Sequence, residues 1–108
     1  MKEKNNTSKT DQYLSNLDQC IVRHAMAISD IAKGEYTDAR YNLEKWYESG
    51  KKALELKPPY PLDEDTEQNA AWYLPTEDDT VDKMLRSLIA GHEKSKETVE
   101  RSKSFHIN

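Results

Sequence analysis

Residues 36–57 read YTDARYNLEKWYESGKKALELK, and their apolar or small side chains recur at intervals of three and four. This period places them on one side of an α-helix, so the segment is predicted to form an amphipathic helix with one buried stripe. Tyr47 and Leu54 flank this stripe and widen it beyond a simple coiled-coil contact. The stripe itself consists of Tyr36, Ala39, Leu43, Trp46, Gly50 and Ala53.

A second helix is predicted before this one, beginning at Thr10. Its apolar residues follow the same repeat, and a further row on an adjacent face indicates contact with two neighbours. Gly34 fits the position just after a helix C-terminus. Because the connection is so short, the two helices are predicted to pack antiparallel as a hairpin. The main row is Leu14, Leu17, Ile21, His24, Ile28 and Ile31, and the adjacent row is Val22, Ala25, Met26 and Ala32.

Proline residues bound the segment that follows the hairpin. Three prolines between positions 58 and 61 cannot continue the helix, and Pro75 ends a short helix predicted within residues 62–75. Thr76 with Asp79 resembles a capping box and is predicted to open the last long helix. The apolar positions of that helix, which become sparse after His92, are Val81, Leu85, Leu88, His92 and Val99.

The predicted fold class is therefore all-α, with a long antiparallel helical hairpin, a short crossover helix and a third long helix in a three- to four-helix bundle. A chain of 108 residues with 35% hydrophobic and 33% charged residues suits one small domain of long helices rather than a thick core. We expect a disordered lead at residues 1–9, a single helical domain at 10–104 and a flexible tail at 105–108.

The cellular location is predicted from the cysteine count and from the apolar runs. Cys20 is the single cysteine, so the chain cannot form an internal disulfide, and a reducing compartment is the simpler interpretation. No apolar run reaches the length of a membrane span or a signal sequence. We therefore expect a soluble, cytoplasmic protein without membrane contact.

One local resemblance concerns the ends of the central helix. Residues 34–39, GEYTDA, and residues 53–58, ALELKP, resemble the start and the end of the second helix of a tetratricopeptide repeat. In that family the two motifs lie about two turns closer together, and the family's first-helix pattern is not matched here. The resemblance implies binding of a protein partner. We interpret the motifs as those of a well-capped helical hairpin and not as family membership.

Charge is unevenly distributed along the chain. Residues 58–82 carry eight acidic side chains and no Lys or Arg, whereas the whole chain has a net charge of −4. Acidic groups near helix N-termini are favoured by the helix dipole, which is one interpretation. The functional interpretation is that residues 62–82, which we call the acidic crossover, meet a basic surface on a partner protein. Direct nucleic-acid binding is disfavoured because the basic residues of the last helix alternate with Glu93, Glu97 and Glu100.

Two carboxylate pairs in this segment could also hold a metal. Glu64 with Glu67, and Asp79 with Asp82, have the i, i+3 spacing that binds Mg²⁺ in helical nucleotide hydrolases. Pro75 separates the two pairs, and acid-rich helix starts produce this spacing by chance. We therefore predict no metal site, no cofactor and no enzymatic activity, and we keep a magnesium-dependent hydrolase as an alternative.

His24 and His92 each occupy an apolar position of a long helix. One interpretation is that both are histidines at the edge of the core; the other is that they face a shared region and sense pH near neutrality. Cys20 precedes His24 by one turn, which gives at best two zinc ligands, so zinc is disfavoured. Cys20 fits a small buried apolar residue better than a nucleophile, because no glycine-rich loop lies near it.

Aromatic residues in the crossover could cover the core or contact a partner, because tryptophan and tyrosine dominate binding hot spots. The sequence thus predicts a small regulator or inhibitor that binds a partner protein through its hairpin face and its acidic crossover. Structural self-assembly, for example as a homodimer, is the principal alternative. The predicted partner-binding residues are Asp63, Glu64, Asp65, Glu67, Trp72, Tyr73, Glu77, Asp78 and Asp79.

Overall fold

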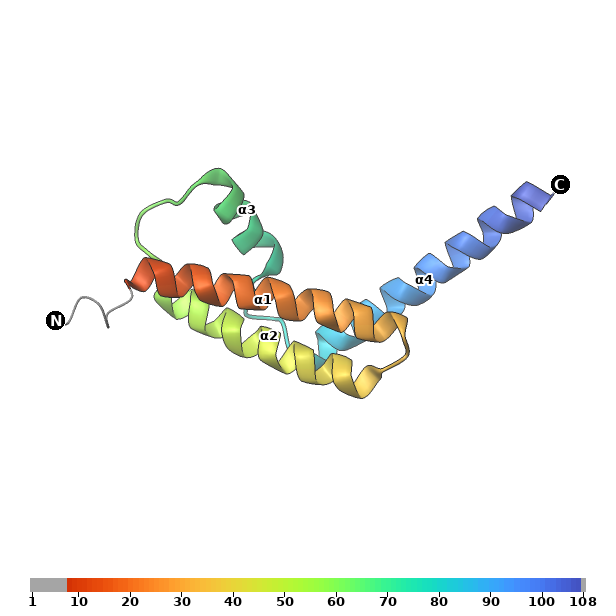
Figure 1. Cartoon of the computed structure of the whole chain (residues 1–108), viewed down its shortest axis with the longest axis horizontal. Coiled ribbons are helices and arrows are strands. Elements are labelled where there is room, and N and C mark those ends of the chain that lie inside the picture. Colours follow the sequence, from red (N-terminus) through yellow and green to blue (C-terminus); the bar gives the residue numbers. More distant parts are fainter. Residues whose placement is uncertain (1–7, 108) are drawn as a thin grey trace.

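The computed structural model describes the backbone of residues 8–107 and the side chains of residues 8–103. Within that range the chain forms four α-helices and no strand, which confirms the predicted all-α class (Figure 1). The helices are α1 (Lys9–Ala32), α2 (Tyr36–Leu56), α3 (Glu64–Tyr73) and α4 (Val81–Ile107). Residues 1–7, most of the predicted disordered lead, lie outside the described residues. Ser8 caps α1 by accepting a hydrogen bond from the Asp11 backbone N–H at 3.0 Å.

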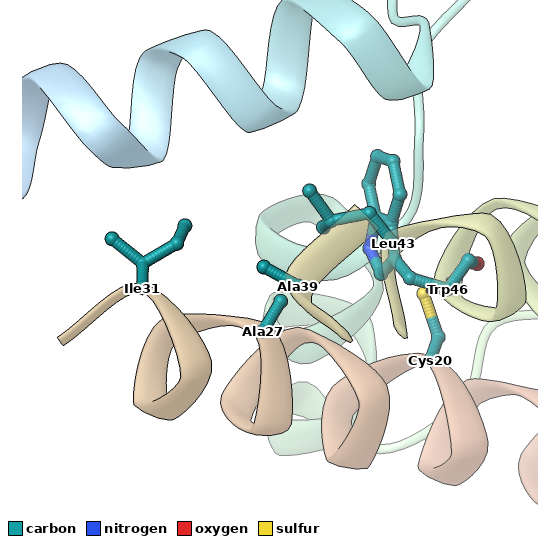
Figure 2. Close-up of a cluster of buried hydrophobic side chains, with 6 residues drawn as sticks. All are labelled: Cys20, Ala27, Ile31, Ala39, Leu43 and Trp46. Carbon is teal, nitrogen blue, oxygen red and sulfur yellow. Dashed lines mark hydrogen bonds between the residues drawn. The ribbon is translucent and has the colours of Figure 1, made fainter. Parts of the chain in front are cut away.

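Helices α1 and α2 lie side by side and antiparallel, as the short connection predicts (Figure 1). Gly34 makes the turn with φ of 77°, in the left-handed region that glycine adopts at little cost. The predicted stripe of α2 is buried from Ala39 to Ala53, with Trp46 only 1% exposed (Figure 2). Tyr36 is the exception, because it starts the helix and is 42% exposed.

The buried row of α1 differs from the predicted one. Leu17 and Ile31 are buried as predicted, but Ile28 is 47% exposed, and Leu14, Ile21 and His24 are only partly buried. The residues of α1 that face α2 include the small Cys20 and Ala27, which allow the two helices to approach closely (Figure 2). Leu14 and Ile21 instead pack against the cluster that contains Ala70 of α3. The observed buried row is Tyr13, Leu17, Cys20, Ala27 and Ile31.

The segment between α3 and α4 crosses the hairpin at Gly50. A Cβ atom at Gly50 would overlap Cδ of Pro75, so only glycine leaves room for the proline ring. The end of α3 is held at the same place, because the carbonyl of Tyr73 accepts the Trp46 Nε1–H at 2.8 Å and the Cys20 thiol at 3.3 Å. The small residue in the stripe thus marks the place where the crossover lies on the hairpin.

Helix α4 begins four residues later than a capping box at Thr76 would place it. Asp79 does accept the Thr76 backbone N–H at 2.7 Å, but this bond closes a turn. The hydroxyl of Thr80 accepts the Lys83 backbone N–H and caps the helix. The prediction that Thr76 opens the last helix is therefore wrong, because Thr80 offers the same type of cap closer to the first packed residue, Val81.

Only the first part of α4 packs on the hairpin. Val81, Met84, Leu85, Leu88 and Ile89 pack against the hairpin core, whereas every side chain from Glu93 to Lys103 is exposed. The helix continues to Ile107, past residue 104, and extends beyond the turn of the hairpin (Figure 1). The principal-axis extents of the chain are 69 × 30 × 26 Å. We call residues 93–107 the arm.

Candidate partner-binding surface

Helix α3 is fixed by its two ends. At its N-terminus Asp63 accepts hydrogen bonds from the backbone N–H and the hydroxyl of Thr66, and these bonds lower the pKa of the Asp63 carboxyl. Glu67 accepts the Leu62 backbone N–H at 3.0 Å and pairs with Lys57, and both interactions lower its pKa. At the C-terminus the Tyr73 carbonyl is bound to the hairpin as described above. Ala70 is the buried residue of α3.

The aromatic residues of the crossover divide into two groups. Tyr73 and Leu74 are partly buried. The hydrophobic core consists of two clusters, one around Trp46 and one around Tyr13, and Leu74 packs against both. Trp72 is 80% exposed, and Tyr60 is 52% exposed with its hydroxyl bonded to Thr10. Tyr73 and Leu74 therefore cover the core. Trp72 presents its ring to solvent, and its backbone is fixed because the carbonyl of the next residue, Tyr73, is hydrogen-bonded to the hairpin.

The eight acidic residues of the crossover also divide into two groups. Four of them maintain local structure, because Asp63 and Asp79 bond backbone N–H groups, Glu67 pairs with Lys57, and Asp82 pairs with Arg40. The carboxylates of the other four form no ion pair with a described residue, and their side chains are exposed. These four are Glu64, Asp65, Glu77 and Asp78.

The two carboxylate pairs with i, i+3 spacing are not arranged as a metal site. Glu67, Asp79 and Asp82 are already engaged with Lys57, a backbone N–H and Arg40, respectively. Among the side chains that the structure describes, no group of three or more His, Cys, Asp or Glu is placed to hold a metal ion.

The two histidines have different surroundings. His24 lies against Tyr73 in an edge-on contact, with ring centroids 5.4 Å apart, and near Trp46 at 6.5 Å. Burial lowers the pKa of His24 from its usual 6.5. His92 instead lines a groove between the end of α1 and α4. The two histidines therefore have different neighbours, and the structure does not bring them together in one shared region.

Cys20 is fully buried, and burial raises the pKa of its thiol to about 12. A thiol with such a pKa remains protonated near neutrality and is a poor nucleophile. Its position in the core agrees with the interpretation of Cys20 as a small buried residue.

Two buried polar groups were not anticipated from the sequence. Asn42 is 5% exposed and links the hairpin helices, because it accepts from Arg23 at 2.9 Å and donates to Asp30 at 2.7 Å. The hydroxyl of Tyr13 is buried without a hydrogen-bond partner among the described residues. The position of Asn42 directly before Leu43, at the edge of the stripe, is the signal that could have identified the first of these groups.

Comparisons with protein-family models, with curated proteins and with solved structures found no match to this chain. None of the helices within residues 8–107 combines the length and the apolar character needed to cross a lipid bilayer.

Proposed function

We propose that this chain is a non-enzymatic protein-binding module whose contact surface is the outer side of α3 and the acidic residues beside it. The observation that carries the proposal is the 80% exposure of Trp72. Tryptophan is enriched at binding hot spots and is costly to leave in water, so an exposed ring at a fixed position suits an anchor for a partner.

The position of Trp72 is set by the hairpin. Tyr73, the next residue, is bound through its carbonyl to Trp46 and Cys20 in the core. The backbone at the anchor therefore needs little further ordering when a partner binds, which reduces the entropic cost of association. The hairpin acts as the scaffold for α3.

The acidic residues indicate the chemistry of the partner. Glu64 and Asp65 precede Trp72 on α3, and Glu77 and Asp78 follow it, and all four are exposed. A partner with an apolar pocket surrounded by Lys and Arg would complement this surface, and its association would weaken with salt. A regulator or inhibitor that occupies a basic functional surface of its target fits these features, with the cytoplasm as its proposed location.

The test is affinity capture from a nuclease-treated lysate of the cells that make the chain, at low and at high salt, with mass spectrometry of the bound proteins. Trp72→Ala is expected to reduce capture of the partner at least about tenfold. Tyr41→Ala is the matched control, because Tyr41 is a 52% exposed aromatic residue on the hairpin. Capture that survives Trp72→Ala unchanged would refute the proposed surface.

A second pair of variants tests the acidic component. Glu64→Lys with Asp65→Lys is expected to abolish the low-salt capture, whereas Asp18→Lys with Glu55→Lys changes the net charge equally at exposed positions of the hairpin. Equal loss with both pairs would mean that net charge alone, and not this surface, governs binding.

A further inference from the structure

Helix α3 lies on the hairpin with few buried side chains of its own. Ala70 is its buried residue, and both of its ends lead into loops, residues 57–63 and 74–80 (Figure 1). A hollow of about 250 Å³ lies between the end of α2 and α3, with Leu54 and Ala71 in its lining. Because burial of apolar side chains is the main source of stability, little free energy holds α3 in place. Helix α3 can therefore leave the hairpin at low cost.

The face of α1 that α3 covers in part carries polar groups at successive turns. Tyr13, Cys20 and His24 follow the helical period along the row that includes Leu17. The Tyr13 hydroxyl has no hydrogen-bond partner among the described residues, and Tyr13 lies in one cluster with Ala70. A buried hydroxyl without a partner costs free energy, and the cost disappears when water reaches the hydroxyl. The closed position of α3 thus carries a cost that opening relieves.

His24 lies against the C-terminal end of α3. Its ring contacts the ring of Tyr73 edge-on, with centroids 5.4 Å apart. The carbonyl of the same Tyr73 accepts the hydrogen bonds from Trp46 and Cys20 that fix α3 to the hairpin. No described residue forms a hydrogen bond or an ion pair with the His24 imidazole. The imidazole and the attachment point of α3 therefore belong to one cluster.

The titratable groups around His24 come from two helices. Helix α1 contributes the Cys20 thiol one turn away, and α3 contributes Tyr73, whereas Trp46 of α2 does not titrate. Burial is the cause that lowers the pKa of His24, and no charged side chain of any helix contributes to this shift. Cys20 remains a thiol because burial raises its pKa to about 12. Between about pH 7.5 and about pH 5 the charge of this cluster thus changes at His24.

We propose that α3 is a pH-dependent lid, which covers Cys20 and Trp46 near neutrality and is released from the hairpin when His24 becomes protonated. An imidazolium ring needs hydrogen bonds from water, and the contact with Tyr73 limits them. Release of α3 exposes the ring of His24, so protonation and opening favour each other. The two loops tether the lid, so it can open while α1 and α2 stay packed.

The direction of the pH effect follows from the pKa of His24. In the closed state burial holds this pKa below 6.5, and in the open state the exposed ring returns toward 6.5. The open state therefore binds more protons, and its population rises as the pH falls below 6.5. Between about pH 7.5 and about pH 5 the rise has a limit of about thirtyfold, set by titration of the open-state imidazole.

The carboxylates that fix α3 respond in a different pH range. Hydrogen bonds lower the pKa of Asp63 from 3.8 and that of Glu67 from 4.5. Their contributions to the closed state are present above these values and are lost only as the pH falls below them. A change between about pH 7.5 and about pH 5 consequently reports on His24 and not on these two groups.

Opening of the lid does not require a partner. If Trp72 anchors a partner, as in the proposed function, release of α3 frees the Trp72 backbone and weakens capture at acidic pH. Labelling of Cys20 in the free chain is independent of partner capture, so each of the two proposals can fail without the other.

The single cysteine provides the first test. Dipyridyl disulfide reacts with thiols at acidic as well as neutral pH, and it reaches Cys20 only when the buried thiol is uncovered. The labelling rate of the folded full chain is divided by the rate of the urea-unfolded chain at the same pH, which removes the intrinsic pH dependence of the reaction. We expect this ratio to rise at least about threefold from about pH 7.5 to about pH 5. A ratio that does not rise overturns the proposal.

Two histidine variants assign the rise. His24→Gln should abolish it, whereas His92→Gln should keep it, because His92 lies in the groove between α1 and α4 and not against Tyr73. The comparison uses the change with pH and not the absolute rate, so a variant whose lid opens more often at every pH remains informative. A rise that persists in His24→Gln overturns the proposal.

Urea separates opening of the lid from unfolding of the hairpin. Release of α3 exposes little surface, so the labelling ratio at about pH 5 should depend weakly on urea below the unfolding transition. A steep dependence on urea would mean that Cys20 is labelled through global unfolding, and it would overturn α3 as the moving element.

Tyr13→Phe tests the cost of the closed state. Removal of the unpaired hydroxyl should lower the labelling ratio at least about fivefold at both pH values, because the closed lid then buries no orphan donor. Tyr41→Phe, at a 52% exposed position of the hairpin, is the matched control and should leave the ratio unchanged. Equal ratios in the two variants would contradict the cost that opening of the lid is proposed to relieve.

Discussion

The hairpin and the arm are both helical, and they differ in what covers them. In the hairpin, α1 and α2 bury a continuous row of side chains against each other, including Trp46 and Leu43 at 1% and 0% exposure. In the arm, Val99 is 52% exposed and no described side chain is buried. The difference indicates that buried contacts stabilise the hairpin, whereas the described part of the arm has only its own helical hydrogen bonds and exposed side chains to stabilise it.

The two tryptophans provide the largest expected contrast. Trp46→Ala removes a fully packed ring and its hydrogen bond to the Tyr73 carbonyl, and should lower the free energy of unfolding by about 3–5 kcal/mol. Trp72→Ala should change it by less than about 0.5 kcal/mol, because that ring is exposed. Urea unfolding followed by circular dichroism measures both. A similar loss in the two variants would contradict the described placement of α3.

The next largest change in stability is expected from the buried hydrogen bonds of Asn42 inside the hairpin. Asn42→Ala leaves Arg23 and Asp30 without the amide that links them, and should cost about 1–3 kcal/mol of unfolding free energy. Ser49→Ala is a control on the same helix, at a partly buried position. If the two variants unfold at the same urea concentration, the Asn42 link does not contribute to the hairpin.

Glycine substitutions should have opposite signs in the two regions. Gly50→Ala forces a methyl group against Pro75 and should destabilise the fold by about 1–3 kcal/mol. Gly91→Ala has open space and should stabilise α4 by about 0.5–1 kcal/mol through better helix propensity. Thermal unfolding measures both effects as shifts of the melting temperature. The same sign for both would refute the close contact at Gly50.

The smallest effect concerns pH and belongs to the hairpin. Burial lowers the pKa of His24 below the 6.5 of the unfolded chain, so the unfolded state binds more protons below that pH. The part of the unfolding free energy that depends on neutral His24 is fully present above pH 6.5. It is lost as the pH falls from 6.5 through the lower pKa that His24 has in the folded state. His24→Gln should flatten this slope in urea midpoints measured between pH 5 and pH 7.5. A slope unchanged in that variant would assign it to other groups.

The helices could be predicted from the sequence because their signals are local. Gly34, the prolines near position 60 and the stripe of α2 fix where the helices begin and end to within a few residues. The facing of α1 could not be fixed in the same way. The rows through Leu14 and through Tyr13 both repeat every seven residues, and only the approach of α2 to the small Cys20 and Ala27 selects the second.

The candidate surface was predicted in part, for similar reasons. Composition identifies the acidic residues, but only the fold separates Asp63 and Glu67, which bond the backbone and Lys57, from Glu64 and Asp65. Adjacent residues of a helix point in different directions, so which of Trp72 and Tyr73 faces the core depends on where Pro75 crosses Gly50. That crossing is a tertiary contact with no local signal.

The central claim is that buried side chains hold the hairpin together, whereas no buried side chain holds the described part of the arm. Hydrogen exchange of the full chain, followed residue by residue, tests it most directly. We predict strong protection of the backbone amides in α1 and α2 and weak protection of those in residues 93–107. Equal protection of the hairpin and the arm would contradict this account.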